Sequence, residues 1–491
     1  MHNHTDNYTF LTSGPIPRVI LTMAVPTIIS MLVTSIYNIA DTFFVGHLDT
    51  QATAAVGVVF SLMFMTQAFG FFFGHGSGNY ISRELGAKRH GNAERMAVTG
   101  FVYSFLFGCI IAIGGHCLLT PLSYWLGSTP TILPYTKQYL GIILIGAPFL
   151  TSSLTLNNQM RLQGNASLAM YGIVSGAIVN VVLDPVFIFG FDMGVRGAAL
   201  STVIGQVLSF CILLCMTYRG ENIPIRLKNF WPGWQPLREI FYGGSPSLSR
   251  QGLTAISTLL LNQAAGNYGD AAIAAMSIVG RISTFIISVV IGTGQGFQPF
   301  CGFCYGAQLY TRLRKGYWFT VKVGTAFLIF CSLLTVCFSS TAISIFRNDA
   351  DVISIGGHAL MLQLCTWCVT PVIMVSNMLL QTCRKPFRAN VLASARSGLF
   401  FIPAILIFPH WLGLLGIEIA QPVSDILSFF YNSTYCSWLF QRIEERGKSF
   451  VIFIGKTYGV CRGARTVSGS DNAQTTGKLC NLWKSPYVKE K

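Results

Sequence analysis

Asp41 and Asp184 are acidic residues inside long apolar stretches, and they are the first candidates for chemistry in this sequence. Asp41 lies in segment 26–46 (PTIISMLVTSIYNIADTFFVG), which holds no basic residue, and Asp184 lies in segment 169–190 (AMYGIVSGAIVNVVLDPVFIFG). A carboxylate near the middle of a bilayer costs about 2.5–3.5 kcal/mol on insertion scales, so acids in such segments are functional candidates. Two neighbouring buried carboxyl groups suit a shared proton or a hard monovalent cation.

Polar side chains accompany both acids at helical spacing. Tyr37 and Asn38 precede Asp41 by four and three residues, so the three side chains share one helix face. A phenol and an amide can hydrogen-bond to a carboxyl group in either protonation state. Asn180 precedes Asp184 by four residues in the same way. The alternative interpretation is structural, with these side chains tying one helix to its neighbour.

Two prolines mark places where the backbone should deviate from a regular helix. Pro26 removes a backbone hydrogen bond in the first apolar stretch, so we expect that helix to bend there. Pro185 follows Asp184 directly and disfavours regular helix at the acid. Irregular backbone at membrane depth is tolerated where it lines a cavity or an ion site. Neighbouring apolar stretches add Asn157 and Thr202 as further oxygen ligands.

Composition places these residues in an integral membrane protein. Of the 491 residues, 52% are hydrophobic and only 10% are charged, whereas a soluble protein carries about 25% charged residues. Apolar runs of roughly 20 residues, enough to span a bilayer, recur along most of the chain. The predicted spans are 17–43, 52–74, 96–118, 138–160, 168–190, 197–218, 240–264, 272–299, 317–338, 357–383, 389–409 and 413–440. The predicted fold is therefore an all-α membrane protein of twelve transmembrane helices.

The second half of the sequence repeats the first at low identity. When the halves are aligned without a gap, Pro26 falls on Pro246, and Gly46 falls on Gly266. The matches are mostly Pro and Gly, whose backbone geometry limits replacement. Six spans per repeat is an even number, so both halves enter the membrane from the same side and form two pseudo-symmetric lobes, as in parallel-repeat transporters. Asp41 falls on Leu261, so its acid is not repeated.

The repeat predicts how the chain is divided. The predicted parts are a cytoplasmic N-terminal segment 1–15, a first lobe 16–218, a cytoplasmic linker 219–239, a second lobe 240–440 and a basic cytoplasmic tail 441–491. Such an architecture predicts a cavity between the lobes that opens alternately to either side of the membrane.

The net charge of +15 follows the membrane topology, so we expect no nucleic-acid partner. Loops on one side of the membrane hold fifteen basic residues, whereas the opposite loops hold three. The fifteen are Arg83, Lys88, Arg89, Arg95, Arg161, Arg219, Arg226, Lys228, Arg238, Arg312, Arg314, Lys315, Arg384, Lys385 and Arg388. The positive-inside rule then predicts that both termini lie in the cytoplasm.

Several motifs together with the two acids resemble the multidrug and toxin extrusion (MATE) transporters, specifically their DinF-like branch. The motifs are D-x-F-F-V-G-x-L within 26–48, A-A-V-G at 54–57, I-S-R-x-L-G-A-K at 81–88, L-D-P at 183–185 and G-x-x-G-A-A at 194–199. The resemblance covers about 15–440. A related branch carries acids in its seventh and tenth spans, but segments 241–264 and 357–383 hold none here.

The resemblance implies a secondary active antiporter that exports cationic or amphipathic organic compounds in exchange for protons or sodium ions. The cation site of this branch looks like a first-lobe cluster that matches Asp41, Asn157, Asn180, Asp184 and Thr202 here. We expect a monomer in a bacterial plasma (inner) membrane, with small organic molecules and the lipid bilayer as partners. No cofactor is expected beyond the coupling ion, H⁺ or Na⁺.

Two other functions share parts of this pattern. A flippase for a lipid-linked or oligosaccharide substrate has the same architecture but needs a strongly basic central cavity, and the few intramembrane arginines argue against it. A membrane enzyme needs a His/Asp/Glu or metal constellation in an interfacial loop, and the sequence shows none. For Arg396 and Asp425 we predict an ion pair between helices. His75, between two glycines that would interrupt the second span, is interpreted as structural.

Overall fold

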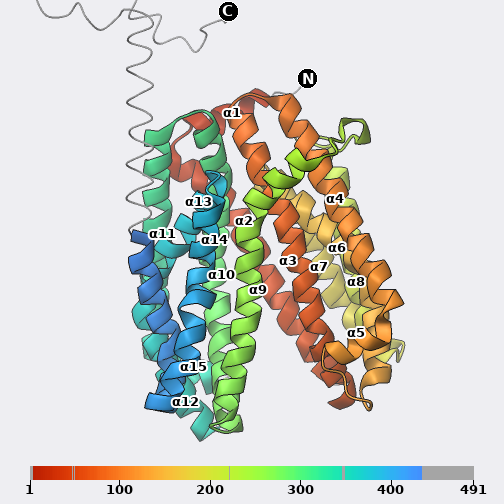
Figure 1. Ribbon diagram of the computed structural model, residues 1–491, viewed down its shortest axis with the longest axis vertical. Coiled ribbons are helices and arrows are strands. Elements are labelled where there is room, and N and C mark those ends of the chain that lie inside the picture. Colours follow the sequence, from red (N-terminus) through yellow and green to blue (C-terminus); the bar gives the residue numbers. More distant parts are fainter. Residues whose placement is uncertain (1–3, 47, 49, 221, 345–348, 434–491) are drawn as a thin grey trace, which may run out of the picture. The chain divides into compact units, whose positions relative to one another are not determined.

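The computed structural model describes residues 4–46, 48, 50–220, 222–344 and 349–433, and within these ranges every regular element is a helix. The predicted tail 441–491 lies outside the described residues. The all-α fold is confirmed, and the helices fall into two halves that are coloured red to yellow and green to blue in Figure 1.

The first half contains six long helices and two short ones. They are α1 (His4–Ser13), α2 (Ile16–Gly46), α3 (Thr50–Gly86), α4 (His90–Cys117), α5 (Leu119–Trp125), α6 (Leu133–Leu162), α7 (Ala166–Pro185) with the π-helical turn η1 (Val186–Gly190), and α8 (Gly194–Thr217). Each of the six long helices overlaps one of the first six predicted spans, and α3 continues past the end of its predicted span 52–74.

The second half repeats this plan with more breaks in its helices. It contains the short η2 (Leu227–Asn229), α9 (Trp234–Gly266), α10 (Asp270–Gly306), α11 (Tyr310–Ser344), α12 (Ala350–Trp367), α13 (Thr370–Thr382), α14 (Pro386–Ser394) with the π-helical turn η3 (Ala395–Leu399), α15 (Phe401–Leu412) and a helix over 414–433. Helices α12 and α13 together form one span, and α14, η3 and α15 form another.

The helices account for the predicted twelve spans. Among the described residues, nine helices are long and apolar enough to cross a membrane, and the bent pair α12–α13 makes a tenth. Helix α9 and the 414–433 helix complete the set. Helix α9 is less apolar than the others because its interior carries Arg250 and Gln251.

Three local predictions were wrong in detail. The predicted span 357–383 is bent by 55° between α12 and α13, because Pro371 near the start of α13 has no N–H to continue the preceding helix. Helix α9 begins at Trp234, inside the predicted linker 219–239. Arg83 and Arg161, predicted in loops, lie in the last turns of α3 and α6.

Helix ends meet across the two halves at the end of the bundle that carries α1, called here the α1 end. Glu239 of α9 pairs with Arg83 at 3.5 Å and with Arg384, and Arg83 also donates to the Thr382 carbonyl at 2.9 Å. These partners explain why α3 extends further than its apolar run predicts. At the same end, Arg89 binds Glu84 through Nε and Nη2, both at 2.7 Å, and these bonds raise the pKa of Arg89 above its ordinary value.

Candidate cation site

The two acids singled out by the sequence are buried together in the first half. Asp41 on α2 is 3% exposed, and Asp184 on α7 is fully buried. Helix α2 packs along α7, which in turn packs along α8. The charge of Asp184 acts on Asp41, so the two carboxyl groups are near enough to repel each other when both are ionised.

A pair of glycines brings α7 and α8 close enough to share side-chain hydrogen bonds. A Cβ atom on Gly176 would lie 2.6 Å from the Gly205 carbonyl oxygen, and one on Gly205 would lie 2.8 Å from the Gly176 oxygen. Only glycine therefore fits at this crossing. The close approach places Asn180 of α7 against α8, and its amide donates to the Thr202 hydroxyl at 3.3 Å.

Hydroxyl groups on α8 complete the polar surroundings of Asp184. Ser201 donates a short hydrogen bond to Oδ1 of Asp184, and Thr202 donates to the Ala198 carbonyl at 2.9 Å. Tyr37 of α2 and Tyr139 of α6 both interact with Thr202, and the charges of both acids act on their phenol groups. Tyr37 was predicted to support Asp41, and the structure brings it to this cluster.

Three oxygen atoms of the cluster are left without a hydrogen-bond donor among the described residues. They are Oδ1 of Asp41, Oδ1 of Asn180 and Oδ2 of Asp184, and all three are buried. Buried acceptors without a partner are costly. None of the ion pairs found among the described residues involves Asp41 or Asp184. An acceptor-rich cluster with two carboxyl groups and no described basic partner is suited to a proton or a small monovalent cation.

Other predicted site residues lie in different surroundings. Asn157 on α6 donates to the Ala169 carbonyl at 2.8 Å, so its amide supports the start of α7. The side chain of Asn38 lies outside the described residues. Pro26 lies within α2, where its carbonyl accepts a hydrogen bond from Ser30 at 3.0 Å. After Pro185 the backbone changes from α to the π-helical turn η1.

A known family model matches this chain twice, once in each of the two sequence repeats. The MatE family model matches residues 26–186 and again residues 246–406, which together make up more than half of the chain. The chain belongs to the MatE family. The two matched segments begin at Pro26 and Pro246, the prolines that correspond in the sequence repeat. No branch of the family is specified by this match, so the DinF-like assignment of this MATE chain stays a prediction.

Curated relatives of this MATE chain include two staphylococcal proteins. The multidrug export protein MepA of Staphylococcus saprophyticus is 27% identical over 398 residues, which is 80% of this chain and 87% of the relative. MepA of Staphylococcus haemolyticus is 26% identical over 431 residues, which is 86% of this chain and 94% of the relative.

Solved structures show the same fold. An outward-facing multidrug resistance MATE family transporter of the MOP superfamily superimposes with a TM-score of 0.86 at 24% identity. The match covers 90% of this chain and 100% of that one. The predicted MATE-type membrane fold with two six-helix lobes is thereby confirmed.

Two residues of the MATE cluster were missed from the sequence. Ser201 donates to Asp184, and the fully buried Tyr139 also makes a weak 3.8 Å contact from its hydroxyl to the sulfur of Met63. Serine and tyrosine are ordinary residues in membrane helices, so neither carries a signal of its own. The only available hint was the position of Ser201 beside Thr202.

The buried acids of the second half are paired with bases. Arg396 binds Asp425 at 2.8 Å, which confirms the predicted pair. Gln421 also donates to Asp425 at 2.8 Å. Glu418 is 4% exposed and lies 2.5 Å from Nδ1 of His358. The helix 414–433 thus holds two acids that have a partner within the protein, an arginine for Asp425 and a histidine for Glu418.

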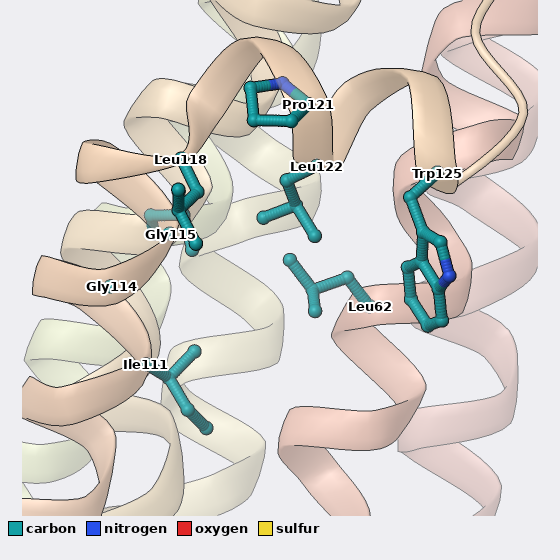
Figure 2. Close-up of a pocket in the computed structure, with 9 residues that line it drawn as sticks. Leu62, Ile111, Gly114, Gly115, Leu118, Pro121, Leu122 and Trp125 are labelled. Atoms are coloured by element: carbon teal, nitrogen blue, oxygen red, sulfur yellow. The ribbon is translucent and has the colours of Figure 1, made fainter.

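The first half also contains an apolar pocket of about 370 Å³, and neither Asp41 nor Asp184 lines it. Figure 2 shows α4, α5 and α3 around it, with the Leu62 side chain pointing toward Leu122. The lining residues are Leu62, Ile111, Gly114, Gly115, Leu118, Pro121, Leu122, Trp125 and Leu144. These side chains offer no charge and suit hydrocarbon, so the pocket is not part of the cation site.

Proposed function

We propose that the chain is a secondary active antiporter that exports amphipathic organic compounds, cationic ones included, in exchange for protons or sodium ions. The observation that carries this proposal is the pair of buried carboxyl groups, Asp41 and Asp184, whose unpartnered oxygens lie in one cluster. A cation there neutralises charge that no described basic residue neutralises. The names of the staphylococcal relatives support multidrug export as the class of transport.

Coupling is proposed to act through the contact between the two halves. Helix α2 carries Asp41 and also packs along α10 of the second half, where Ser35 and Ser288 lie 3.3 Å apart. A cation that binds the first-half cluster changes the charge next to this contact. If one conformation of the lobes binds the cation better, cation entry shifts the population toward that conformation. Asn180 and Thr202 are proposed as the neutral ligands of the same site.

We place the protein in a bacterial plasma membrane, with the α1 end and both termini in the cytoplasm. The basic residues Arg83, Arg89, Arg312 and Arg384 gather at this end, as the positive-inside rule requires. Small organic molecules and lipid are the proposed partners, the proposed state is a monomer without nucleic acid or cofactor, and no enzymatic activity is assigned.

A flippase for a lipid-linked or oligosaccharide substrate remains the second candidate. Arg161 and Arg250 lie between the halves and act on each other electrostatically, which gives this candidate the basic residues it requires. Dye export is not expected from a dedicated flippase, so the two candidates differ in a direct assay.

The test is efflux of rhodamine 123, a cationic dye, from cells that express equal amounts of each variant. Asp41→Asn and Asp184→Asn should each lower efflux at least tenfold. The control Asp351→Asn, an exposed acid in the first turn of α12, should leave it unchanged. Collapse of efflux by a protonophore identifies H⁺, and dependence on sodium identifies Na⁺. Parental rates in both acid variants would refute first-half coupling, and no dye efflux by the parent would favour the flippase.

A further inference from the structure

A second polar cluster lies between the halves and is centred on Arg161, which is 2% exposed. Its Nη1 donates to Oε1 of Gln295 at 2.8 Å, and its Nη2 donates to Oδ1 of Asn158 at 2.5 Å. Nη2 also lies 3.1 Å from Nε2 of His75. Because a guanidinium only donates, this histidine nitrogen accepts, and the ring proton lies on Nδ1, 3.1 Å from Ser247. Every partner of Arg161 is therefore uncharged.

The cluster occupies corresponding positions of the two repeats. In the alignment that places Pro26 on Pro246, His75 corresponds to Gln295, and Arg161 corresponds to Gln381. Gln381 also reaches the cluster, since it donates to the Ser247 hydroxyl at 2.9 Å. Four residues from equivalent places thus meet where the halves join, with the basic groups in the first half and amides in the second.

The halves touch tightly around this cluster. A Cβ atom on Gly76, next to His75, would lie 2.3 Å from the carbonyl oxygen of Ile240 on α9. The groups around Arg161 come from α3 and α6 on one side and from α9, α10 and α13 on the other. Separation of the halves would therefore remove the Gln295 oxygen from Arg161 and uncover its guanidinium.

The positive charge of this cluster has no acidic partner among the described residues. Glu239 neutralises Arg83, and Asp425 neutralises Arg396. Arg161 instead has only neutral partners, and its Nε has none. Half-buried Arg250 on α9 adds a second positive charge to the cluster, since its charge acts on both Arg161 and His75. Within the described chain, the Arg250 side chain makes no hydrogen bond or ion pair. A buried charge without a counter-ion is strongly unfavourable unless a ligand provides one.

We propose that Arg161, with Arg250, binds an acidic group, a carboxylate or a phosphate monoester, on compounds that the protein transports. The vacant Nε of Arg161 is one donor for such a group. A two-point contact on the same edge also needs Nη2, so the acid would replace one of its neutral partners, Asn158 or His75. The proposal goes beyond export of cationic compounds and adds organic anions and zwitterions as substrates. It rests on the proposed transport function only in that the bound acid is taken to be a transported substrate.

The test compares two xanthene dyes of opposite charge, fluorescein and rhodamine 123, at pH 8. The full chain is reconstituted in phosphatidylcholine nanodiscs, and binding is followed by fluorescence polarisation. Arg161→Gln installs the residue that the second half has at the corresponding position. We expect it to weaken fluorescein binding at least tenfold and to leave rhodamine 123 binding within twofold. The control Arg196→Gln removes an exposed positive charge on the first turn of α8 and should change neither.

Three outcomes overturn the proposal: no binding of fluorescein by the parent, equal fluorescein affinity in parent and Arg161→Gln, or equal weakening of both dyes. If Arg161→Gln does not fold, Arg161→Lys keeps the charge without the planar fork, and it should bind fluorescein several-fold more weakly than the parent. Rhodamine 123 export without fluorescein binding would refute this proposal and leave the transport function standing. Failure of the parent to transport either dye would refute the transport function itself.

The same assay separates a soluble acid from a lipid headgroup as the ligand. Phosphatidylglycerol is added to the nanodiscs in increasing proportion. Competition with fluorescein in the parent assigns the site to an anionic headgroup, whereas the absence of competition assigns it to a soluble organic acid. In both cases the anion must lose affinity when Arg161 is replaced, and retention of affinity counts against the site.

Discussion

In the first half, Asp41 and Asp184 are buried, and one carboxyl oxygen of each lacks a donor among the described residues. In the second half, Asp425 and Glu418 are equally buried, yet Arg396 holds one at 2.8 Å and His358 holds the other at 2.5 Å. The two halves share one fold, so the difference comes from side chains alone. The difference lies in the partner of the acid. In the second half it is a basic side chain of the protein, whereas in the first half, where no described basic residue pairs with the acids, we propose an exchangeable ion.

This asymmetry has a functional consequence. An acid that is paired with an arginine keeps its counter-ion through every conformation in which the pair holds, so it cannot couple ion movement to lobe movement. An acid without a basic partner gains or loses a proton or sodium ion according to the accessibility of its site. This contrast supports the proposal that coupling acts in the first half, although the repeat by itself does not distinguish the halves.

The largest expected effect comes from breaking the second-half ion pair. Asp425→Asn leaves Arg396 without a charged partner in a largely buried place, which should lower the free energy of unfolding by about 3 kcal/mol. Asp184→Asn, which breaks no ion pair, should change it by less than about 1 kcal/mol. Thermal unfolding of both purified variants in the same detergent measures the difference. Equal destabilisation would mean that Asp184 has an internal counter-ion after all, and the contrast between the halves would fail.

A smaller effect is expected at Glu418. His358→Phe removes the partner of a buried carboxyl group, but the histidine side chain is 56% exposed, so water relieves part of the cost. We expect a loss of about 1–2 kcal/mol in stability. The double variant His358→Phe/Glu418→Gln should recover most of it, because no unpaired carboxyl remains. If the double variant is less stable than the single one, the pair is not what stabilises this helix contact.

The sequence predicts the acids of the first half well because a single charged residue in an apolar span is a rare event. Asp41, Asp184, Asn180, Thr202 and Tyr37 were all found from residue type and helical spacing, and the structure brings them together. The proline and glycine repeat likewise predicts two halves. The sequence alone carries these signals, because they depend either on the free energy of placing a charged residue in the bilayer or on the backbone geometry of proline and glycine.

Contacts between helices were not predictable in the same way. The position of Arg161 near the end of an apolar run predicts a loop residue, whereas the structure buries it between the halves. Its acceptors Gln295 and His75 lie far from it in the sequence, on other helices, and nothing in the local pattern links them. The 55° bend between α12 and α13 had one local signal, Pro371, whose effect depends on how the flanking helices pack.

Asn157 allows a direct test of how far the equivalence of the halves extends. Its amide donates to the Ala169 carbonyl at 2.8 Å, and Asn377, its counterpart in the second repeat, donates to the Ala389 carbonyl at 2.7 Å. Asn157→Ala and Asn377→Ala should therefore each cost about 1 kcal/mol in stability, with dye efflux within about twofold of the parent for both. Thermal unfolding and efflux are measured on the same preparations. Loss of coupling in Asn157→Ala alone would make Asn157 a cation ligand, as the family resemblance implies.

A similarly small effect on stability is expected at Ser201, which donates to Asp184. Ala420 occupies the corresponding position of the second half when Leu208 is aligned with Leu427. Ser201→Ala should cost only about 0.5–1.5 kcal/mol in stability, but it removes a donor that stabilises the ionised carboxyl group. The proton or sodium concentration that gives half-maximal efflux in proteoliposomes should therefore shift several-fold. The matched control is Ser424→Ala, which loses a 2.7 Å hydrogen bond to the Arg396 carbonyl. It should show a similar loss of stability with no shift in ion dependence, because its hydrogen bond goes to a backbone carbonyl and not to an acid. An equal shift in both variants would mean that the ion dependence reports packing of the helices rather than the charge of Asp184.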